Sequence, residues 1–202
     1  MPSADFFRRF GFLVVRDFLD APSCAAIRTE VRASMRAPGR IWRSPTAPAV
    51  DESARKVDQA TVSAPTKSRV AARLDALRPR LESHFGVSLT HCEPPQFLQY
   101  RDGHFYEMHR DRDADADSDP TVRTRQVSVS IFLNDHDVAP RPETFMGGSL
   151  TFYGLLADSR ARAIGLPLLA EAGLLVAFRA DVLHAVEPVT WGERHTIVTW
   201  YG

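Results

Sequence analysis

The chain has 202 residues, of which 44% are hydrophobic and 25% are charged, a composition typical of one folded domain with a sizeable core. Lys and Arg together number 25, as do Asp and Glu, and this balance argues against nucleic acid or an anionic membrane as a partner. No apolar run approaches the roughly 20 residues that span a bilayer, no signal-peptide cleavage site follows the N-terminus, and the two cysteines form no CxxC pair. We therefore expect reduced thiols and a cytoplasmic location.

Two helices are predicted in the first 88 residues, over about Pro22–Met35 and Pro65–Phe85. Asp20 and Ser63 precede them, where a side chain can accept hydrogen bonds from the amides of the first turn. Each helix carries an apolar stripe at helical spacing: Cys24, Ile27, Val31 and Met35 in the first, and Val70, Leu74, Leu77 and Leu81 in the second. Between the helices, residues 38–56 are rich in Pro, Ser and charge and predict a loop.

From residue 89 onward, the pattern changes to short strands rich in β-branched and aromatic residues and bounded by Gly, Pro or Asp. The predicted segments are 95–100, 125–134, 148–154, 173–178 and 194–202. In the second, Ser128 and Ser130 alternate with apolar residues, which predicts a strand with only one buried face. Many short strands with frequent turns indicate a mainly β (α+β) sandwich or barrel and not a series of βαβ units.

The most polar stretch, "QYRDGHFYEMHRDRDADADSDP" at 99–120, first suggests a calcium loop. A helix-loop-helix calcium site needs Gly at its sixth position and Glu at its twelfth. Counting from Asp113 puts Ser118 and Thr124 at those positions, and counting from Asp111 puts Ala116 and Val122 there. This form of calcium site is therefore rejected, and residues 113–119 are expected to form a solvated loop.

A transition-metal site is a better hypothesis. His109 is the one histidine with Asp two residues later, and two such side chains on a strand would share one face. The rival pair, His91 with Glu93, precedes two prolines that would interrupt a strand. Two His and one carboxylate form the facial triad of non-haem iron enzymes, which requires a third ligand from a distant strand.

His184 is a candidate for that ligand, because ten residues later Arg194 begins a strand pattern. Alternation places Thr196, Val198 and Trp200 on the same face as Arg194, and a cation beside a hydroxyl can bind a carboxylate. Each residue also has a structural explanation when taken alone. His109 with Asp111 could be a surface pair, His184 a half-buried histidine, and Arg194 an exposed hairpin residue.

Four blocks, in order and spacing, resemble the prolyl 4-hydroxylase-like 2-oxoglutarate- and iron(II)-dependent dioxygenases. They are "YRDGHFYEMHRD" at 100–111, "FLN" at 132–134, "GGSLTFY" at 147–153 and "LHAVEPVTWGERHTIVTW" at 183–200. The resemblance covers most of the chain after residue 89. It implies a double-stranded β-helix (a cupin-like jelly roll) over 89–202, with residues 1–88 as a helical support region and loop. The helices are expected to pack on one sheet of a single domain, 1–202.

The resemblance also implies roles for individual residues. The iron ligands would be His109, Asp111 and His184. Arg194 would bind the distal carboxylate of 2-oxoglutarate, with Thr196 beside it and with Tyr100 and Trp200 in the pocket. Tyr106 would be either a pocket residue or a packing residue, and His104 a bystander. Two positions depart from the family pattern: Phe132 stands where some relatives have Tyr, and Ser149 where Glu is common.

The implied cofactors are Fe(II), 2-oxoglutarate and dioxygen, with ascorbate as an optional addition. The implied reaction is hydroxylation of an unactivated C–H, with decarboxylation of 2-oxoglutarate to succinate, since related halogenases lack the carboxylate that Asp111 provides. The substrate stays open among peptidyl proline, free amino acids and natural-product intermediates, and loops 38–56 and 112–125 are expected to select it. A non-catalytic metabolite-binding domain and a zinc hydrolase using the same triad are the alternatives.

Overall fold

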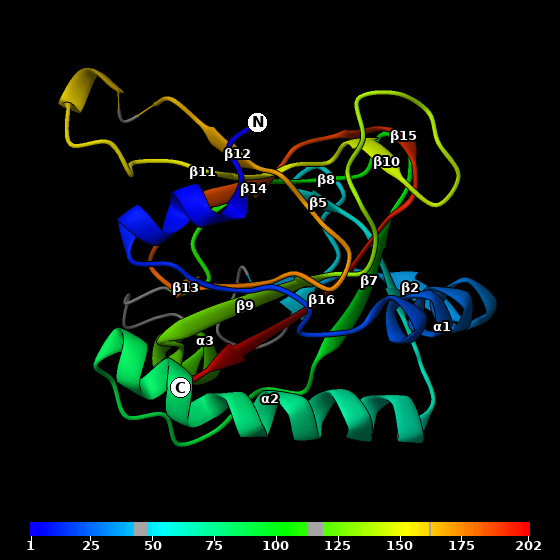
Figure 1. Ribbon diagram of the computed structural model, residues 1–202, viewed down its shortest axis with the longest axis horizontal. Helices are drawn as coiled ribbons and strands as arrows, with labels where there is room; N and C mark the ends of the chain where they lie inside the picture. The colour runs from blue at the N-terminus through cyan, green and yellow to red at the C-terminus, as the bar shows by residue number, and fades with distance from the viewer. Residues whose placement is uncertain (43–47, 113–118, 162) are drawn as a thin grey trace.

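The computed structural model describes residues 1–42, 48–112, 119–161 and 163–202. Its two principal sheets are antiparallel and face one another, with helices against the outside of one of them (Figure 1). Together the sheets form a double-stranded β-helix, as predicted. Every strand pairing in the described part of the chain except one isolated bridge is antiparallel, so βαβ units are excluded there.

The larger sheet has seven strands in the order β1-β13-β9-β16-β7-β6-β2. Their bounds are Leu13–Val15 (β1), Leu175–Arg179 (β13), Val127–Phe132 (β9), Arg194–Tyr201 (β16), Gln96–Tyr100 (β7), Asp58–Ala60 (β6) and Arg36–Pro38 (β2). Strands β7, β9, β13 and β16 coincide with predicted segments. Strands β1, β2 and β6 come from the first 88 residues, which therefore contribute to the sheet as well as supplying helices.

The smaller sheet has five strands in the order β12-β11-β14-β8-β5. Their bounds are Leu166–Leu168 (β12), Leu150–Phe152 (β11), His184–Val186 (β14), Phe105–His109 (β8) and Arg55–Lys56 (β5). Two short pairs complete the described strands: Phe145–Gly147 (β10) with Val189–Gly192 (β15), and Ile41–Trp42 (β3) with Pro48–Ala49 (β4). Much of the segment predicted as a loop over 38–56 is thus short antiparallel strands, although residues 43–47 lie outside the described part.

The central strand β9 is buried on both faces, so the prediction of a half-buried strand was wrong. Its odd-numbered residues, Val127, Val129 and Ile131, pack in the core under the helices. Ser128 and Ser130 face the other way and line a cavity between the sheets. The sequence pattern was correct in its alternation, but the polar face meets an internal cavity and not solvent.

Helices α1 (Ala21–Ala33) and α2 (Ala64–Phe85) cover the outer face of the larger sheet (Figure 1). Asp20 accepts a hydrogen bond from the Ser23 amide at 2.7 Å and so caps α1 as predicted. Both predicted stripes are buried in one core with the sheet, except that Met35 is 84% exposed. The prediction for Met35 was wrong because α1 ends at Ala33, and Met35 lies in the turn before β2.

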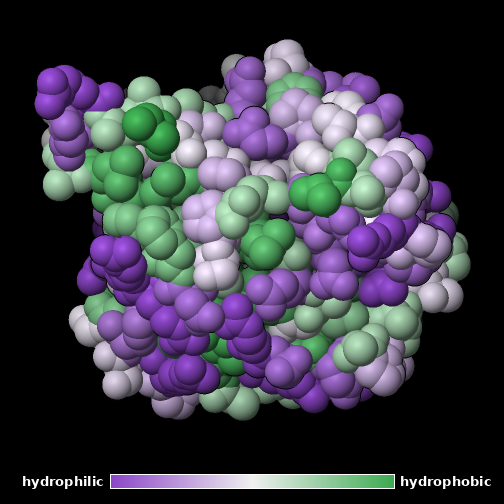
Figure 2. Space-filling view, turned by 45° about the horizontal axis from the view of Figure 1, so that its top comes forward, coloured by the Kyte–Doolittle hydropathy of each residue, from purple (hydrophilic) through white to green (hydrophobic). Residues whose placement is uncertain are grey.

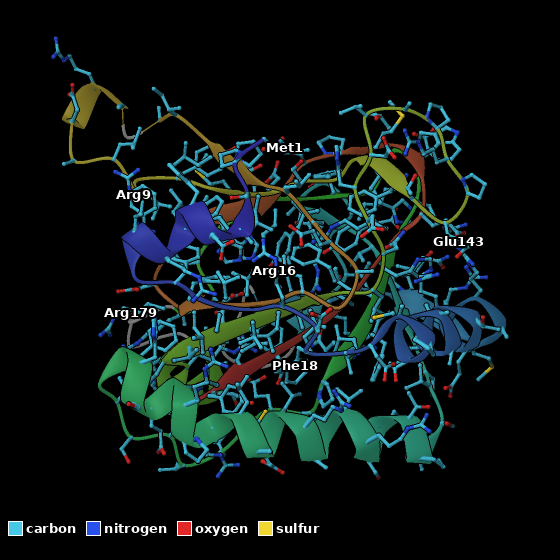
Figure 3. The ribbon with its side chains drawn as sticks, in the orientation of Figure 1. Met1, Arg9, Arg16, Phe18, Glu143 and Arg179 are labelled. Atoms are coloured by element: carbon cyan, nitrogen blue, oxygen red, sulfur yellow. The ribbon has the colours of Figure 1, made fainter. Side chains whose placement is uncertain are left out.

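Ion pairs hold α1 to the loop before β10. Arg28 Nε lies 3.1 Å from a carboxylate oxygen of Glu143, and Arg32 Nη1 lies 3.0 Å from the same residue (Figure 3). Arg32 Nε also pairs with Glu193 at 2.7 Å, directly before β16. Since Glu193 precedes Arg194, these contacts fix the start of the strand that carries the predicted cosubstrate residue.

A 3-10 helix, η1 (Ala4–Phe10), closes one end of the space between the sheets (Figure 1). Phe7 and Phe12 contact Phe152 at ring-centroid distances of 5.3 and 4.7 Å, and Phe152 contacts Phe178 at 5.0 Å. This aromatic cluster seals that end of the β-helix. The cavity lined by the two serines lies between the same two sheets.

The remaining described helices are short: α3 (Pro120–Thr124) and η2 (Ser159–Ala161). Asp119 caps α3 by accepting a hydrogen bond from the Thr121 amide at 2.8 Å. Figure 2 shows hydrophilic side chains over much of one face, with hydrophobic ones gathered beside the projecting segment around η2. Among the described residues, no helix is both long and apolar enough to cross a membrane.

Candidate metal centre

The three predicted ligands meet because strand β14 pairs with strand β8. In this antiparallel pair His184, the first residue of β14, lies opposite His109, the last residue of β8. Asp111 follows in the bend after β8, so the pair His109 and Asp111 is not carried by one strand as expected. The Asp111 amide instead donates to the Ala180 carbonyl at 3.0 Å, which holds the bend in place.

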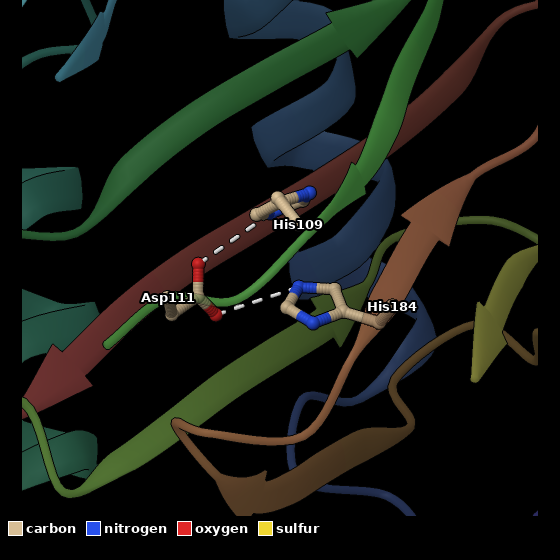
Figure 4. A group of neighbouring side chains, drawn as sticks. All are labelled: His109, Asp111 and His184. Atoms are coloured by element: carbon tan, nitrogen blue, oxygen red, sulfur yellow. Dashed lines mark ion pairs between the residues drawn. The ribbon is translucent and has the colours of Figure 1, made fainter. Parts of the chain in front are cut away.

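The donor atoms of the three side chains face one point (Figure 4). The two carboxylate oxygens of Asp111 lie 3.6 Å from His109 Nε2 and 3.5 Å from His184 Nε2. Ligands about 2.1 Å from one metal ion, at angles of 90–120°, are separated by roughly 3.0–3.6 Å. The three groups could therefore hold one metal ion with little rearrangement.

Hydrogen bonds aim the metal-binding atoms. His109 Nδ1 lies 2.7 Å from the Glu107 carbonyl oxygen, and His184 Nδ1 lies 2.9 Å from the Val182 carbonyl oxygen. Since a carbonyl can only accept, each Nδ1 must carry the proton, and each Nε2 keeps its lone pair for a metal. The Ser128 hydroxyl donates to Asp111 Oδ2 at 2.7 Å and fixes the carboxylate.

The electrostatics favour the ligand forms of these groups. Burial lowers the pKa of His184 to about 4, helped by His109, so His184 is neutral at pH 7. Burial alone would raise the pKa of Asp111. The nearby His184 and His109 and the Ser128 hydroxyl outweigh that effect, and the pKa of Asp111 falls below its usual range. A neutral imidazole and an ionised carboxylate are the forms that bind metal.

Arg194 lies in the same cavity, on strand β16 opposite Tyr100 of β7. It is only 2% exposed, and burial lowers its pKa to about 10, which leaves it charged at neutral pH. Its Cζ lies 4.8 Å from the ring centroid of Tyr100 and 5.3 Å from that of Phe132. Nη1 donates to the Thr196 hydroxyl at 3.3 Å, whereas the buried Nε has no acceptor in the described part of the chain.

A glycine makes room for this arginine. Gly148 has φ +57°, and a Cβ added there would lie 3.1 Å from Arg194 Cδ and 2.8 Å from Val189 Cγ2. Such contacts are closer than packing tolerates, and L-residues with side chains rarely adopt this φ. Gly148, the second glycine of the third sequence block, therefore allows the backbone to pass close to Arg194.

A sequence profile of the 2OG-Fe(II) oxygenase superfamily matches residues 95–202, more than half of the chain. The chain belongs to this superfamily. Its members use Fe(II), 2-oxoglutarate and dioxygen, so the chain is a 2-oxoglutarate-dependent oxygenase, as the resemblance implied.

Individual relatives agree with this identification. A PKHD-type hydroxylase of Klebsiella pneumoniae (strain 342) is 28% identical over 187 residues, covering 92% of this chain and 76% of the relative. A PKHD-type hydroxylase of Teredinibacter turnerae is 32% identical over 110 residues, which cover 53% of this chain and 42% of the relative. A crystal structure of a Pseudomonas putida prolyl-4-hydroxylase aligns with a TM-score of 0.71 and 25% identity, over 98% of this chain and 95% of that one.

A further solved structure supports the fold alone. It is a prolyl hydroxylase of Trichoplax adhaerens in complex with a peptide fragment of hypoxia inducible factor. Its TM-score is 0.73 at 18% identity, and the alignment covers 98% of the oxygenase described here and 86% of that chain. The double-stranded β-helix is therefore confirmed by comparison as well as by the sheet topology.

The other predicted pocket residues of the oxygenase also line the cavity. Tyr100 and Trp200 both do so, and Thr196 is fully buried beside Arg194. Tyr106, for which two roles were open, lines the cavity too and stacks on His109 with ring centroids 3.6 Å apart. His104 is buried but lines a different hollow, as expected of a bystander.

The remaining residues that the sequence analysis singled out are as follows. Glu93, from the rival pair with His91, forms an ion pair with Arg125 at 2.6 Å. Residues 113–118 of the acidic run lie outside the described part, so the solvated loop expected there stays a prediction. Of the two departures from the family pattern, Phe132 contacts Arg194, and the Ser149 hydroxyl lies 3.2 Å from the Met1 sulfur.

Sequence reasoning assigned no role to Ser128, and it placed Arg125 and Arg55 only within the two loops expected to select the substrate. Arg125 lies with its Cζ 3.9 Å from the ring centroid of Trp200 and donates to the Asp111 carbonyl at 3.3 Å. It therefore supports both a metal-ligand candidate and a wall of the cavity. The alternating serines were a usable signal for Ser128, because a polar face on a central strand needs a polar partner.

Proposed function

We propose that His109, Asp111 and His184 hold the iron of this oxygenase and that Arg194 binds the distal carboxylate of 2-oxoglutarate. The support for the metal site is that three donor atoms lie within 4.8 Å of one another, with each Nδ1 already bound to a carbonyl. The support for the cosubstrate site is a buried guanidinium whose Nε has no acceptor among the described residues. A dianionic ligand supplies what that arginine lacks, since an unpaired buried charge is costly.

The residues around the centre would have distinct tasks. Ser128 holds the Asp111 carboxylate in one orientation, and the carbonyls of Glu107 and Val182 hold the imidazoles. Arg194 and Thr196 would orient 2-oxoglutarate, with the ring of Tyr100 against the guanidinium. When bound, iron and 2-oxoglutarate together supply dioxygen activation for C–H hydroxylation, with succinate and carbon dioxide as the products from the cosubstrate.

Apolar residues would keep the reacting region dry. Leu98, Leu150, Val186 and Val198 line the cavity between its polar groups. A low dielectric strengthens the pairing of Arg194 with a carboxylate and excludes competing water. We infer that the substrate is a small molecule or a peptide, because the relatives include a prolyl-4-hydroxylase and a peptide-bound prolyl hydroxylase. Ascorbate dependence and a cytoplasmic location stay predictions.

The alternatives weighed on the sequence explain less. A zinc hydrolase gives no reason for a charged arginine that is buried in the same cavity as the triad. A non-catalytic binding domain gives no reason for two histidines with fixed tautomers beside a carboxylate that a hydroxyl holds in place. Membership in the oxygenase superfamily favours the iron enzyme over both.

The proposal is tested by anaerobic titration of the Fe(II)-loaded protein with 2-oxoglutarate, monitored by visible absorption. A weak metal-to-ligand charge-transfer band is expected to rise to saturation. His184→Ala should lose bound metal, as measured by metal analysis after dialysis. His104→Ala removes a buried histidine outside the centre, and this variant should retain its bound metal. A chain that binds no iron, or gives no band with 2-oxoglutarate, would refute these assignments.

A further inference from the structure

A second buried arginine lines the metal cavity from the opposite sheet. Arg55 belongs to β5, at the edge of the five-stranded sheet, where it pairs with Tyr106 of β8 (Figure 1). It is only 6% exposed and shares the cavity with His109, Asp111 and Arg194. The task of Arg194 leaves Arg55 unexplained, because one carboxylate of 2-oxoglutarate needs one arginine.

The guanidinium of Arg55 is held firmly in position. Its Cζ lies 4.8 Å from the ring centroid of Tyr106, and its Nη1 donates to the Arg40 carbonyl at 2.7 Å. The backbone of Gly39 packs closely against it, since a Cβ added to Gly39 would lie 3.4 Å from Arg55 Nε. Tyr106 in turn stacks on His109, so the same aromatic ring contacts this cation and a proposed iron ligand.

The charge of Arg55 is not neutralised. Glu52 and Asp58 border a neighbouring hollow with it, but Asp58 pairs with Arg101 at 2.8 Å, and no carboxylate in the described ranges pairs with Arg55. Nε is buried without an acceptor, and within the described chain Nη1 is the atom that donates a hydrogen bond. The edge formed by Nε and Nη2 therefore has no acceptor among the described residues. That edge matches the two oxygens of a carboxylate.

The assembled centre would also leave one positive charge. Iron(II) and the Arg194 cation together balance the Asp111 carboxylate and the two carboxylates of 2-oxoglutarate. Arg55 is then the uncompensated group, in a cavity where an unpaired charge is expensive. A neutral substrate would leave that charge in place, whereas a substrate with one carboxylate would remove it.

We propose that Arg55 binds a carboxylate of the substrate, so that this oxygenase acts on an acid. This inference rests on the proposed function of the same cavity. Since Arg55 and His109 both contact the ring of Tyr106, the oxidised C–H and the carboxylate belong to the same residue or to adjacent residues of the substrate. A free amino acid or other small acid fits this description, as does a peptide with a terminal or side-chain carboxylate next to the reacting residue.

The first experiment uses formate as a minimal carboxylate. Thermal unfolding is followed for protein loaded with Mn(II) and saturating 2-oxoglutarate, with sodium formate titrated against sodium chloride at equal ionic strength. We expect formate to raise the Tm of the wild-type protein, and the apparent affinity to fall at least about tenfold in Arg55→Met. Arg55→Lys, which keeps the charge but loses the two-donor edge, should be intermediate. Equal formate responses in wild type and Arg55→Met, or none in either, would overturn the proposal.

Lys56→Met is the matched control, because it removes the same charge from the next residue of β5, whose side chain is exposed. It should respond to formate as the wild-type protein does. The charge-transfer titration distinguishes failure of the proposed function from failure of the Arg55 assignment. Absence of the band with 2-oxoglutarate means that the proposed function fails. A normal band without an Arg55-dependent formate response means that the assignment of Arg55 alone fails.

The second experiment identifies the source of the carboxylate. Succinate release is measured with free L-amino acids, with their primary amides, and with proline-containing peptides that have either a neutral or an acidic neighbour. Stimulation by free acids but not by their amides indicates a small acid, and stimulation by acidic peptides alone indicates a peptide. In either case Arg55→Met should remove the preference. Equal stimulation by acids and amides would exclude a carboxylate contact.

Discussion

Replacing Arg194 is the sharpest test of the cosubstrate pocket. The side chain is 2% exposed, donates a long hydrogen bond to Thr196, and lies against the rings of Tyr100 and Phe132. If it pairs with the distal carboxylate of 2-oxoglutarate, its loss leaves that carboxylate buried and unpaired. Truncating one partner of such a pair costs roughly 2–5 kcal/mol. Arg194→Ala should therefore weaken 2-oxoglutarate binding by about 30-fold to several thousand-fold.

The assay is equilibrium titration of the Mn(II)- or Fe(II)-loaded variant with 2-oxoglutarate under anaerobic conditions. Metal affinity should be nearly unchanged, because Arg194 is not a ligand, whereas His184→Ala should lose metal first. Arg179→Ala is the matched control. That arginine ends strand β13, is exposed, and donates to the Phe85 carbonyl at 2.9 Å, near the C-terminal end of α2 (Figure 3). Wild-type affinity for 2-oxoglutarate in Arg194→Ala would refute the assignment even with iron bound.

Three further substitutions test the support of the site and the core. Ser128→Ala removes the hydrogen bond to Asp111 and should weaken metal binding about 10-fold or more, measured by metal titration. Leu74→Ala empties a fully buried position under the larger sheet and should cost about 2–5 kcal/mol in denaturant unfolding. Burial lowers the pKa of His195 to about 4, helped by the charge of Arg32. As pH falls below 6.5, His195 therefore takes up a proton in the unfolded chain at a higher pH than in the folded chain. The free energy of unfolding should therefore fall as pH drops from 6.5 toward 4. Between pH 7 and pH 5, the free energy of unfolding of His195→Gln should fall by about 2 kcal/mol less than that of the wild-type protein.

The first two substitutions each have a control in the same element. Ser130→Ala changes the next inward residue of β9, which has no hydrogen bond to Asp111, and should leave metal affinity within a few-fold of wild type. Arg80→Ala changes the exposed side of α2 and should alter stability by less than about 0.5 kcal/mol. Equal effects of the two serine substitutions, or a pH profile that His195→Gln leaves unchanged, would contradict the reasoning.

Local patterns predicted the two long helices and several strands, whereas the double-stranded β-helix was implied by the family resemblance. The stripe in α2, the capping side chain of Asp20 and the β-branched strands all act over a few residues, where spacing alone determines which face is buried. The prediction that Met35 is buried was wrong because the apolar spacing continues past the end of α1 at Ala33. The loop prediction was incomplete at residues 55 and 56, because strand β5 forms only by pairing with the distant strand β8.

The residues of the candidate site likewise fall into two groups, those identified from the sequence and those that were not. The proposed iron ligands and Arg194 were identified because motif spacing is a property of the sequence itself. Ser128, Arg125 and Arg55 act on partners that only the sheet register brings near them. No pattern around Arg55 distinguishes it from other basic residues of its segment. Its burial and its unpaired edge exist only in the folded chain.

The two-sided burial of β9 has a consequence for the evolution and engineering of this enzyme. Neighbouring positions on that strand are under different selective constraints. Residues 127, 129 and 131 pack in the core under the helices, whereas residues 128 and 130 line the reaction cavity. A library that randomises position 130 and keeps Ser128, which holds Asp111, could explore altered selectivity without removing that support. Randomising the odd positions would sample expression level and heat tolerance instead. A single deletion in the strand would exchange the two sets, so point substitution is the accessible route by which this strand can diverge.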